Sequence, residues 1–184
     1  MVDIVSVLAR GNPIPMPLDE LNLPARGAVN LDGYVHYAIG DPGGRQAYAQ
    51  FFRNGAIEGV GELRNDDGVN SRFISGAFTE LIVMRVSQYL QVLKFYETGL
   101  PVYVFLSFCS GAKTVYRYAS PECFGWHETK QLGREIAAFP EIYLDSFDVD
   151  VSAVMRPVFN VVWNAFGLAQ CEIYDGKGKL RGVS

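Results

Sequence analysis

The sequence lacks the features that define several protein classes. It has no apolar run of about 18 residues, which excludes a helix that spans a membrane. Only three of its 184 residues are cysteines, too few for the disulfide framework of a small secreted domain. The N-terminus carries no basic region followed by an apolar stretch and a cleavage site. We therefore expect a cytoplasmic protein without a membrane partner.

Positive charge is also scarce. Sixteen Lys and Arg stand against 20 Asp and Glu, so the formal net charge is −4. A chain of this charge has no basic footprint for nucleic acid, and we expect no direct nucleic-acid binding. Hydrophobic residues make up 49% and charged residues 20% of the chain. This composition is typical of a globular domain with a core.

The distribution of proline and glycine suggests the domain boundaries. Residues 1–28 contain Pro13, Pro15, Pro17 and Pro24, which lack amide donors and bias the preceding residues away from helix. We expect an irregular lead-in or linker there, followed by a single α+β domain over 29–176. Residues 177–184 are expected to be a flexible tail.

A hairpin is the strongest local prediction. The β-favouring runs 47–53 and 56–63 flank Asn54-Gly55. Asn-Gly supplies the positive φ angles that a two-residue type I′ turn needs. An earlier strand is expected around Tyr34–Tyr37, and the polar stretch 64–71 is expected to be a loop.

A long helix is predicted over 75–98, because apolar residues recur there at spacings of three and four. Gly99 is expected to end it in the left-handed conformation. Some apolar residues lie partly outside the main stripe, so the helix either sits deep in the fold or meets a partner. These candidate interface residues are Val83, Met84, Val92 and Phe95.

The second half of the chain predicts further strands and one more helix. The apolar run 102–108 is typical of a central strand, and strands are also expected at 114–118 and 139–147. We expect 120–134 to be a loop and 151–166 to be a helix, capped by Asp150 or Ser152 and ended by Gly167. Pro157 should kink this helix or delay its start.

These elements predict an α+β fold with a mainly antiparallel sheet of five to six strands and two main helices. A profilin-like or longin-like sheet with helices packed on it is one match to this order.

Candidate chemistry is sparse. Cys109, Cys123, His127 and Cys171 are zinc ligands by type, but their spacing lacks the paired ligands of structural sites. Cys109 ends the predicted buried strand, where a free Cys behaves as a small hydrophobe. We predict no metal, no cofactor and no catalytic residue.

Two alternatives remain open. Cys123 and His127 would stand on adjacent turns of a helix as a nucleophile and its base. The acids at 145–150 would serve acid–base chemistry, although capping of the following helix explains them equally well. A small-molecule-binding or hydrolytic domain that uses residues 123–150 is therefore the alternative function.

Four other patterns favour structural roles. Gly111–Thr114 fails the phosphate-loop pattern because Ala112 stands where a glycine is required. Gly176–Lys179 would form a small anion nest, but a solvated turn is the simpler interpretation. Tyr48, Phe51 and Phe52 of the hairpin, beside Arg53, would offer a stacking platform for nucleic-acid bases. Strands use aromatic residues for packing, however, and packing is the simpler interpretation. Arg156 and Trp163 share a helix face and suit a polar anchor.

Four stretches together carry a resemblance to a known family: 30–33 (Asn-Leu-Asp-Gly), 48–58, 156–167 and 174–176. They are similar to the region that follows the Schlafen AlbA-like DNA-binding domain in bacterial transcriptional-regulator-like proteins. The likeness spans about 29–176, and none of its motifs is catalytic.

The resemblance implies an accessory C-terminal domain. The AlbA-like domain itself is missing, so neither nucleic-acid nor nucleotide binding carries over to these residues. The resemblance and the small number of candidate catalytic or metal-binding residues together lead to the hypothesis of a non-enzymatic regulatory or assembly domain. Such a domain would form a homo-oligomer, or sense a partner or ligand for an attached upstream effector.

Overall fold

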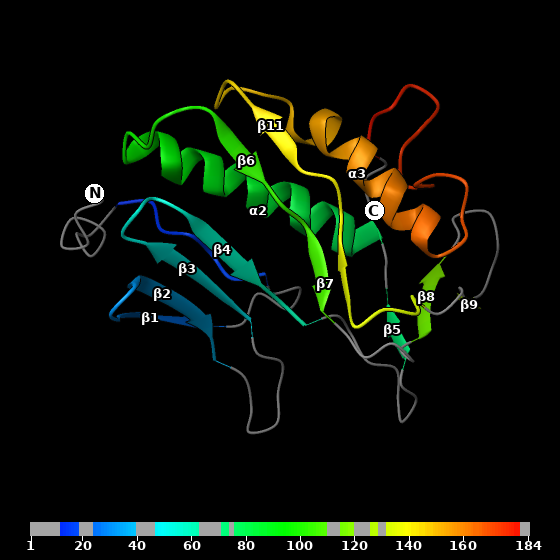
Figure 1. The fold of residues 1–184 in the computed structure, drawn as a ribbon, viewed down its shortest axis with the longest axis horizontal. Coiled ribbons are helices and arrows are strands. Elements are labelled where there is room, and N and C mark those ends of the chain that lie inside the picture. Colours follow the sequence, from blue (N-terminus) through cyan, green and yellow to red (C-terminus); the bar gives the residue numbers. More distant parts are fainter. Residues whose placement is uncertain are drawn as a thin grey trace. The chain divides into compact units, whose positions relative to one another are not determined.

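The computed structural model describes residues 12–18, 24–39, 47–62, 71–73, 76–109, 115–119, 126–128 and 132–180. The chain divides into two compact units. Unit 1 comprises Met1–Glu62 and Leu81–Gly99, and unit 2 comprises Leu63–Glu80 and Leu100–Ser184. Helix α2, Gly76–Phe95, supplies residues to both units. Figure 1 shows the elements of each unit.

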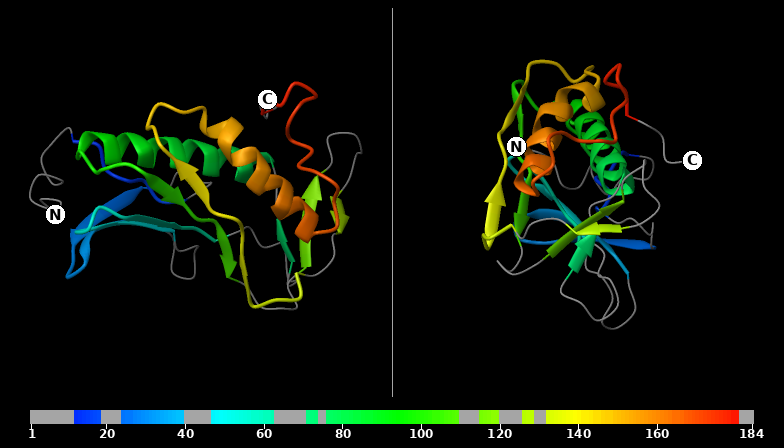
Figure 2. Two further views of the ribbon diagram at one scale, coloured as in Figure 1. Left: turned by 45° about the horizontal axis from the view of Figure 1, so that its top comes forward. Right: turned by 90° about the vertical axis from the view of Figure 1, so that its right-hand side faces the viewer.

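Unit 1 is a four-stranded antiparallel sheet with a helix on one face. The strands are β1 (Ala25–Val29), β2 (Gly33–Ala38), β3 (Tyr48–Phe52) and β4 (Ile57–Val60), in that order across the sheet. The part of α2 that belongs to unit 1 lies along this sheet (Figures 1 and 2). Its core consists mainly of Tyr34, Ala49, Phe51, Ile82, Leu90, Val92 and Leu93.

The α+β class is confirmed: the described residues form mainly antiparallel sheets and two helices. The predicted strand number is wrong for the main sheet, which has four strands. The difference arises because the apolar run 102–108 does not join this sheet and pairs instead within unit 2.

Strand β1 is a second correction, since it lies largely inside the stretch predicted to be an irregular lead-in. Four of its five residues are exposed, so the sequence shows no alternation of apolar and polar positions. The strand is defined by main-chain pairing instead, with Val29 opposite Tyr34 and Ala25 opposite Ala38. Hydrophobic periodicity does not report such an edge strand.

The hairpin between β3 and β4 is confirmed, but its turn differs from the prediction. The Phe52 amide donates to the Ala56 carbonyl (2.9 Å), and the Gly55 amide donates to the Phe52 carbonyl (2.9 Å). Three residues therefore form the loop. Gly55 has a φ of 91°, while Asn54 is not among the residues with positive φ. This is the pattern of a turn followed by a left-handed glycine, rather than a type I′ turn.

The C-terminus of α2 is also built differently. The helix ends at Phe95, and Glu97, with a φ of 53°, takes the left-handed position predicted for Gly99. The Thr98 amide donates to the Leu93 carbonyl (3.0 Å), and the Glu97 amide donates to that of Lys94 (3.1 Å). These two bonds define a Schellman motif in which Glu97 occupies the position that glycine normally fills.

Unit 2 contains a two-stranded antiparallel ribbon. One side consists of β6 (Val102–Val104) and β7 (Ser107–Cys109), and the other of β10 (Ile136–Ala138) and β11 (Ile142–Leu144). Strand β6 pairs with β11, and β7 pairs with β10. The predicted strand at 139–147 thus begins later and is shorter.

The two halves of this ribbon differ in register by one residue. Ala138 lies opposite Ser107, and the Phe139 amide donates to the Leu106 carbonyl (3.0 Å). Beyond this point Ile142 lies opposite Val104. Pro140 and Glu141 therefore oppose the single residue Phe105, which is a β-bulge. Proline is tolerated at a bulge because no ladder donor is needed there.

The apolar run 102–108 is not a central strand. Exposed and less exposed residues alternate along it, with Tyr103 53% and Phe105 73% exposed while Phe108 is 6% exposed. The Phe108 ring packs against Phe78 and Phe139 at centroid distances of 5.7 and 5.2 Å. The run therefore has one core face and one open face, and the prediction of burial on both faces is wrong.

A third sheet belongs to unit 2. It contains β5 (Ser71–Phe73), β8 (Val115–Ala119) and β9 (Trp126–Glu128). Strand β5 pairs with β8 in parallel, and β9 pairs with β8 antiparallel. The presence of β9 corrects the prediction of a loop across 120–134.

Helix α3, Val151–Ala165, covers the core of unit 2 and contacts β11. The predicted N-cap is confirmed, because the Asp150 side chain accepts from the Ala153 amide (3.2 Å). Gly167, with a φ of 84°, forms the predicted stop. Pro157 lies inside the helix without delaying its start. Within the described residues, neither helix is both long and apolar enough to cross a membrane.

The C-terminus of α2 generates a stability prediction. Glu97→Gly should raise the free energy of unfolding by about 1 kcal/mol, because a side chain in the left-handed region costs about that much. Removal of a carboxylate from a helix C-terminus adds to the effect. Urea denaturation measures the change.

A matched control separates this effect from a general effect of glycine. Gln91→Gly, on the exposed side of the same helix, should lower stability by about 1 kcal/mol. If both substitutions destabilise the protein, the left-handed cap at Glu97 does not exist in solution.

Candidate functional site

The cysteines do not form a common site among the described residues. Cys109 is exposed in β7, which corrects the prediction of a buried position. Cys171 is buried, and burial raises the pKa of its thiol to about 11. A thiol with this pKa stays protonated near pH 7 and is a weak nucleophile. Cys123 lies outside the described residues, and only the backbone of His127 is described, in β9.

No group of three or more His, Cys, Asp and Glu side chains that would hold a metal occurs in the part of the chain that the structure describes. The acids at 145–150 follow β11. Asp150 is occupied as the cap of α3, and Asp145 and Asp148 are exposed. Capping accounts for the placement of Asp150 without a catalytic role.

The glycine turn near the C-terminus is closed by its own acid. The Asp175 carboxylate oxygen Oδ1 accepts from the amides of Lys177 (2.9 Å) and Lys179 (2.8 Å). These are donors that an anion nest would offer to a ligand. Asp175 takes that place, and an ordered turn bridges Tyr174 to Leu180.

The aromatic residues of the hairpin serve the core of unit 1. Phe51 is fully buried and packs on Tyr96, with ring centroids 5.2 Å apart. Tyr48 donates its hydroxyl to Glu58 across the hairpin (2.8 Å). Packing is thus the role that the structure gives Phe51, and the alternative, stacking of bases on these rings, would need an open face that Phe51 does not offer.

The polar residues of α3 hold the C-terminal segment. The Asn160 side chain accepts from the Cys171 amide (2.9 Å), and the Asn164 side chain donates to the Leu168 carbonyl (2.8 Å). The Arg156 guanidinium lies 5.5 Å from the centroid of the Tyr174 ring. The predicted anchor therefore binds the chain's own tail, while Trp163 is 2% exposed and part of the core.

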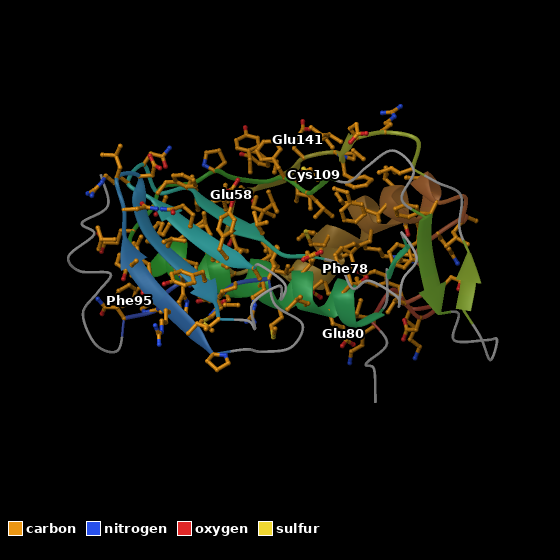
Figure 3. All side chains as sticks on the ribbon, turned by 90° about the horizontal axis from the view of Figure 1, so that it is seen from below. Glu58, Phe78, Glu80, Phe95, Cys109 and Glu141 are labelled. Carbon is orange, nitrogen blue, oxygen red and sulfur yellow. The ribbon has the colours of Figure 1, made fainter. Side chains whose placement is uncertain are left out.

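The interface residues predicted on α2 are divided by the structure. Val92 is fully buried, so it does not lie on a surface that a partner can reach. Val83 is half-buried. Met84 is 47% and Phe95 52% exposed, and Phe95 lies at the end of α2 (Figure 3). Exposed polar Gln91 lies between them in sequence, so these are scattered apolar residues of an ordinary surface.

A more continuous apolar surface lies on the ribbon of unit 2. We call it the ribbon face and define it by Tyr103, Phe105, Ile136 and Tyr143, which are 53, 73, 64 and 57% exposed. The rings of Tyr103 and Tyr143 meet edge to face at a centroid distance of 5.6 Å, and those of Tyr103 and Phe105 stack at 6.5 Å. Sequence reasoning missed this face because it treated the whole run as core.

The ribbon face is almost free of charge. The strands β6, β7, β10 and β11 contain no Lys, Arg, Asp or Glu. Glu141 at the bulge is the charged residue between β10 and β11 (Figure 3). With side-chain areas of about 150–250 Å² each, three rings more than half exposed present about 300–450 Å² of apolar surface.

Unit 1 holds a second unusual feature, a buried histidine. His36 is 7% exposed, and its Nδ1 lies 3.1 Å from the Pro15 carbonyl oxygen. Since a carbonyl only accepts, Nδ1 carries the proton. Burial lowers the pKa of His36, the hydrogen bond to Pro15 opposes this, and the positive charge of Arg85 lowers the pKa further.

Comparison with known proteins finds no family model, no curated protein and no solved structure that matches the chain.

The buried histidine predicts a dependence of stability on pH. Neutral His36 in the folded protein binds fewer protons than the unfolded chain, so stability falls as the pH drops below about 6.5. The loss is complete once the pH is below the lowered pKa of the folded state. Urea denaturation between pH 7.5 and 5 should show this decline.

The matched variant is His36→Asn, whose amide also donates a hydrogen bond but does not titrate. Its stability should change less over the same pH range. An equal decline in both proteins would assign the pH dependence to groups other than His36.

Proposed function

We propose that the chain is a non-enzymatic assembly domain that associates with a second copy of itself through the ribbon face. The observation that carries this proposal is the exposed contact among Tyr103, Phe105 and Tyr143. Aromatic residues are enriched at the centre of protein interfaces, and charged residues are depleted there.

The size and charge of the ribbon face support self-association. A standard interface buries about 800 Å² on each partner, so the rings would supply its apolar centre and the surrounding residues its rim. In a two-fold dimer the same patch meets itself. The strands of the patch carry no charged residue, so Glu141 at the bulge is the like charge that would have to lie at the rim of the contact. A net charge of −4 on the chain disfavours contact through more acidic surfaces.

Several features from the sequence analysis belong to the same proposal. They include the resemblance to the domain that follows the Schlafen AlbA-like domain, an attached upstream effector, and a cytoplasmic location. The likeness of the strand order to profilin-like or longin-like sheets belongs here too. In such a setting, association of this domain would bring two effectors together.

Substitution of the most exposed ring tests the proposal. Light scattering over a concentration series should give a native mass of twice the 20.4 kDa chain. Phe105→Asp should weaken the dimer at least tenfold, since aromatic residues at an interface centre contribute about 2 kcal/mol or more. The variant should keep the circular dichroism of the native protein, because the Phe105 side chain is exposed.

Met84→Asp on α2 is the matched control, as it places the same charge on a similarly exposed apolar residue of unit 1. It should leave the dimer unchanged. A native monomer at all concentrations, or a dimer weakened by Met84→Asp but not by Phe105→Asp, would contradict the assignment of the ribbon face.

A further inference from the structure

The proline-rich segment of residues 12–18, Asn-Pro-Ile-Pro-Met-Pro-Leu, is held inside unit 1. We call it the strap. It runs beside α2 and the sheet of unit 1 (Figures 1 and 2), and Pro15 and Pro17 are buried. A proline stands at every second position, so each residue from 12 to 17 is either a proline or precedes one. Such a segment is extended before it binds and loses little conformational entropy.

Four side chains bind the main chain of the strap. The Tyr89 hydroxyl donates to the Met16 carbonyl (2.6 Å), and Arg85 Nε donates to the Pro17 carbonyl (2.8 Å). The Met16 amide donates to the Gln88 side chain (3.2 Å), and His36 Nδ1 lies 3.1 Å from the Pro15 carbonyl. We call these four residues the strap site.

The pattern of these bonds selects proline. Three successive carbonyls accept from side chains, and Met16 supplies the one main-chain amide between Pro15 and Pro17. Any other residue at 15 or 17 would bring an additional buried N–H. A buried donor without an acceptor costs about 1–3 kcal/mol. The strap site thus recognises an extended Pro-x-Pro segment through hydrogen bonds to the main chain of that segment.

The strap also lies in close contact with the chain just after β4. A Cβ at Gly61, just after β4, would collide with the carbonyl oxygen of Leu18. The strap therefore fills its site as a bound peptide does, although covalent connection places it there. Recognition of proline-rich extended segments is a general mode of peptide binding.

We propose that the strap site is a peptide-recognition site for an extended Pro-x-Pro segment and that the strap of a second copy of this chain can occupy it in exchange. The second copy is the occupant because its strap makes the same four contacts. This exchange is independent of the ribbon face and would give a dimer by a different surface.

Complementation between two full-length variants tests the exchange. The first carries Pro15→Ala and Pro17→Ala, which impair the strap and leave the site. The second carries Gln88→Leu and Tyr89→Phe, which remove both contacts to Met16 and leave the strap. Both also carry Phe105→Asp, so that association through the ribbon face is absent. Each variant alone should have the mass of one chain, and an equimolar mixture should reach twice 20.4 kDa.

A synthetic peptide of residues 12–18 gives a second readout. It should bind the strap variant saturably and raise its melting temperature, whereas a peptide with alanine at 15 and 17 should bind at least tenfold more weakly. Tyr89→Phe should lower binding by a similar factor. Tyr48→Phe, which removes the hydroxyl that bonds Glu58 in the same unit, should not.

The outcomes separate exchange from a purely structural strap. A mixture that stays at the mass of one chain, with no saturable peptide binding, overturns the proposal. If the strap variant is unfolded alone, recovery of its circular dichroism on addition of the second variant or the peptide supports the proposal. Absence of recovery overturns it. Failure of the ribbon face would instead appear in the otherwise native chain as a mass that Phe105→Asp does not lower, whatever the complementation test gives.

Discussion

Each N–H and C=O group of a buried main chain needs a hydrogen-bond partner. This constraint determines how unit 1 is arranged around the strap. Pro15 and Pro17 reduce the requirement because they have no amide to satisfy. The remaining groups are met by side chains from two elements, His36 on β2 and Arg85, Gln88 and Tyr89 on α2. The strap thus connects the helix to the sheet, since side chains from both elements bind its main chain.

In unit 2 the corresponding constraint is the alternation of side chains along a strand. Every second residue of the run 101–109 is exposed, so its apolar residues are divided between the core and the ribbon face. Phe108 joins Phe139 and Phe166 inside, while Phe105 lies outside. The physical question for such a surface is what covers it, since water contact of several large rings is unfavourable.

Local signals predicted the hairpin at Asn54-Gly55, both helices, and the ends of α3 at Asp150 and Gly167. These features depend on residues adjacent in sequence. Strand β1, the burial of Val92 and the open face of 102–108 depend on pairing with distant residues, which hydropathy does not encode. The prolines of the strap predict a linker because proline excludes regular structure, yet proline also suits a segment whose main chain is bound by side chains.

The bulge at Pro140 and Glu141 fixes which side of the ribbon each later residue occupies. Before it the even-numbered Ile136 and Ala138 are exposed, and after it the odd-numbered Tyr143 is exposed while Leu144 is buried. The number of residues between β10 and β11 is therefore more constrained than the identity of those residues. Loss of one residue would exchange the environments of Tyr143 and Leu144. Among related chains, insertions and deletions should avoid these two positions even where their residue types vary freely.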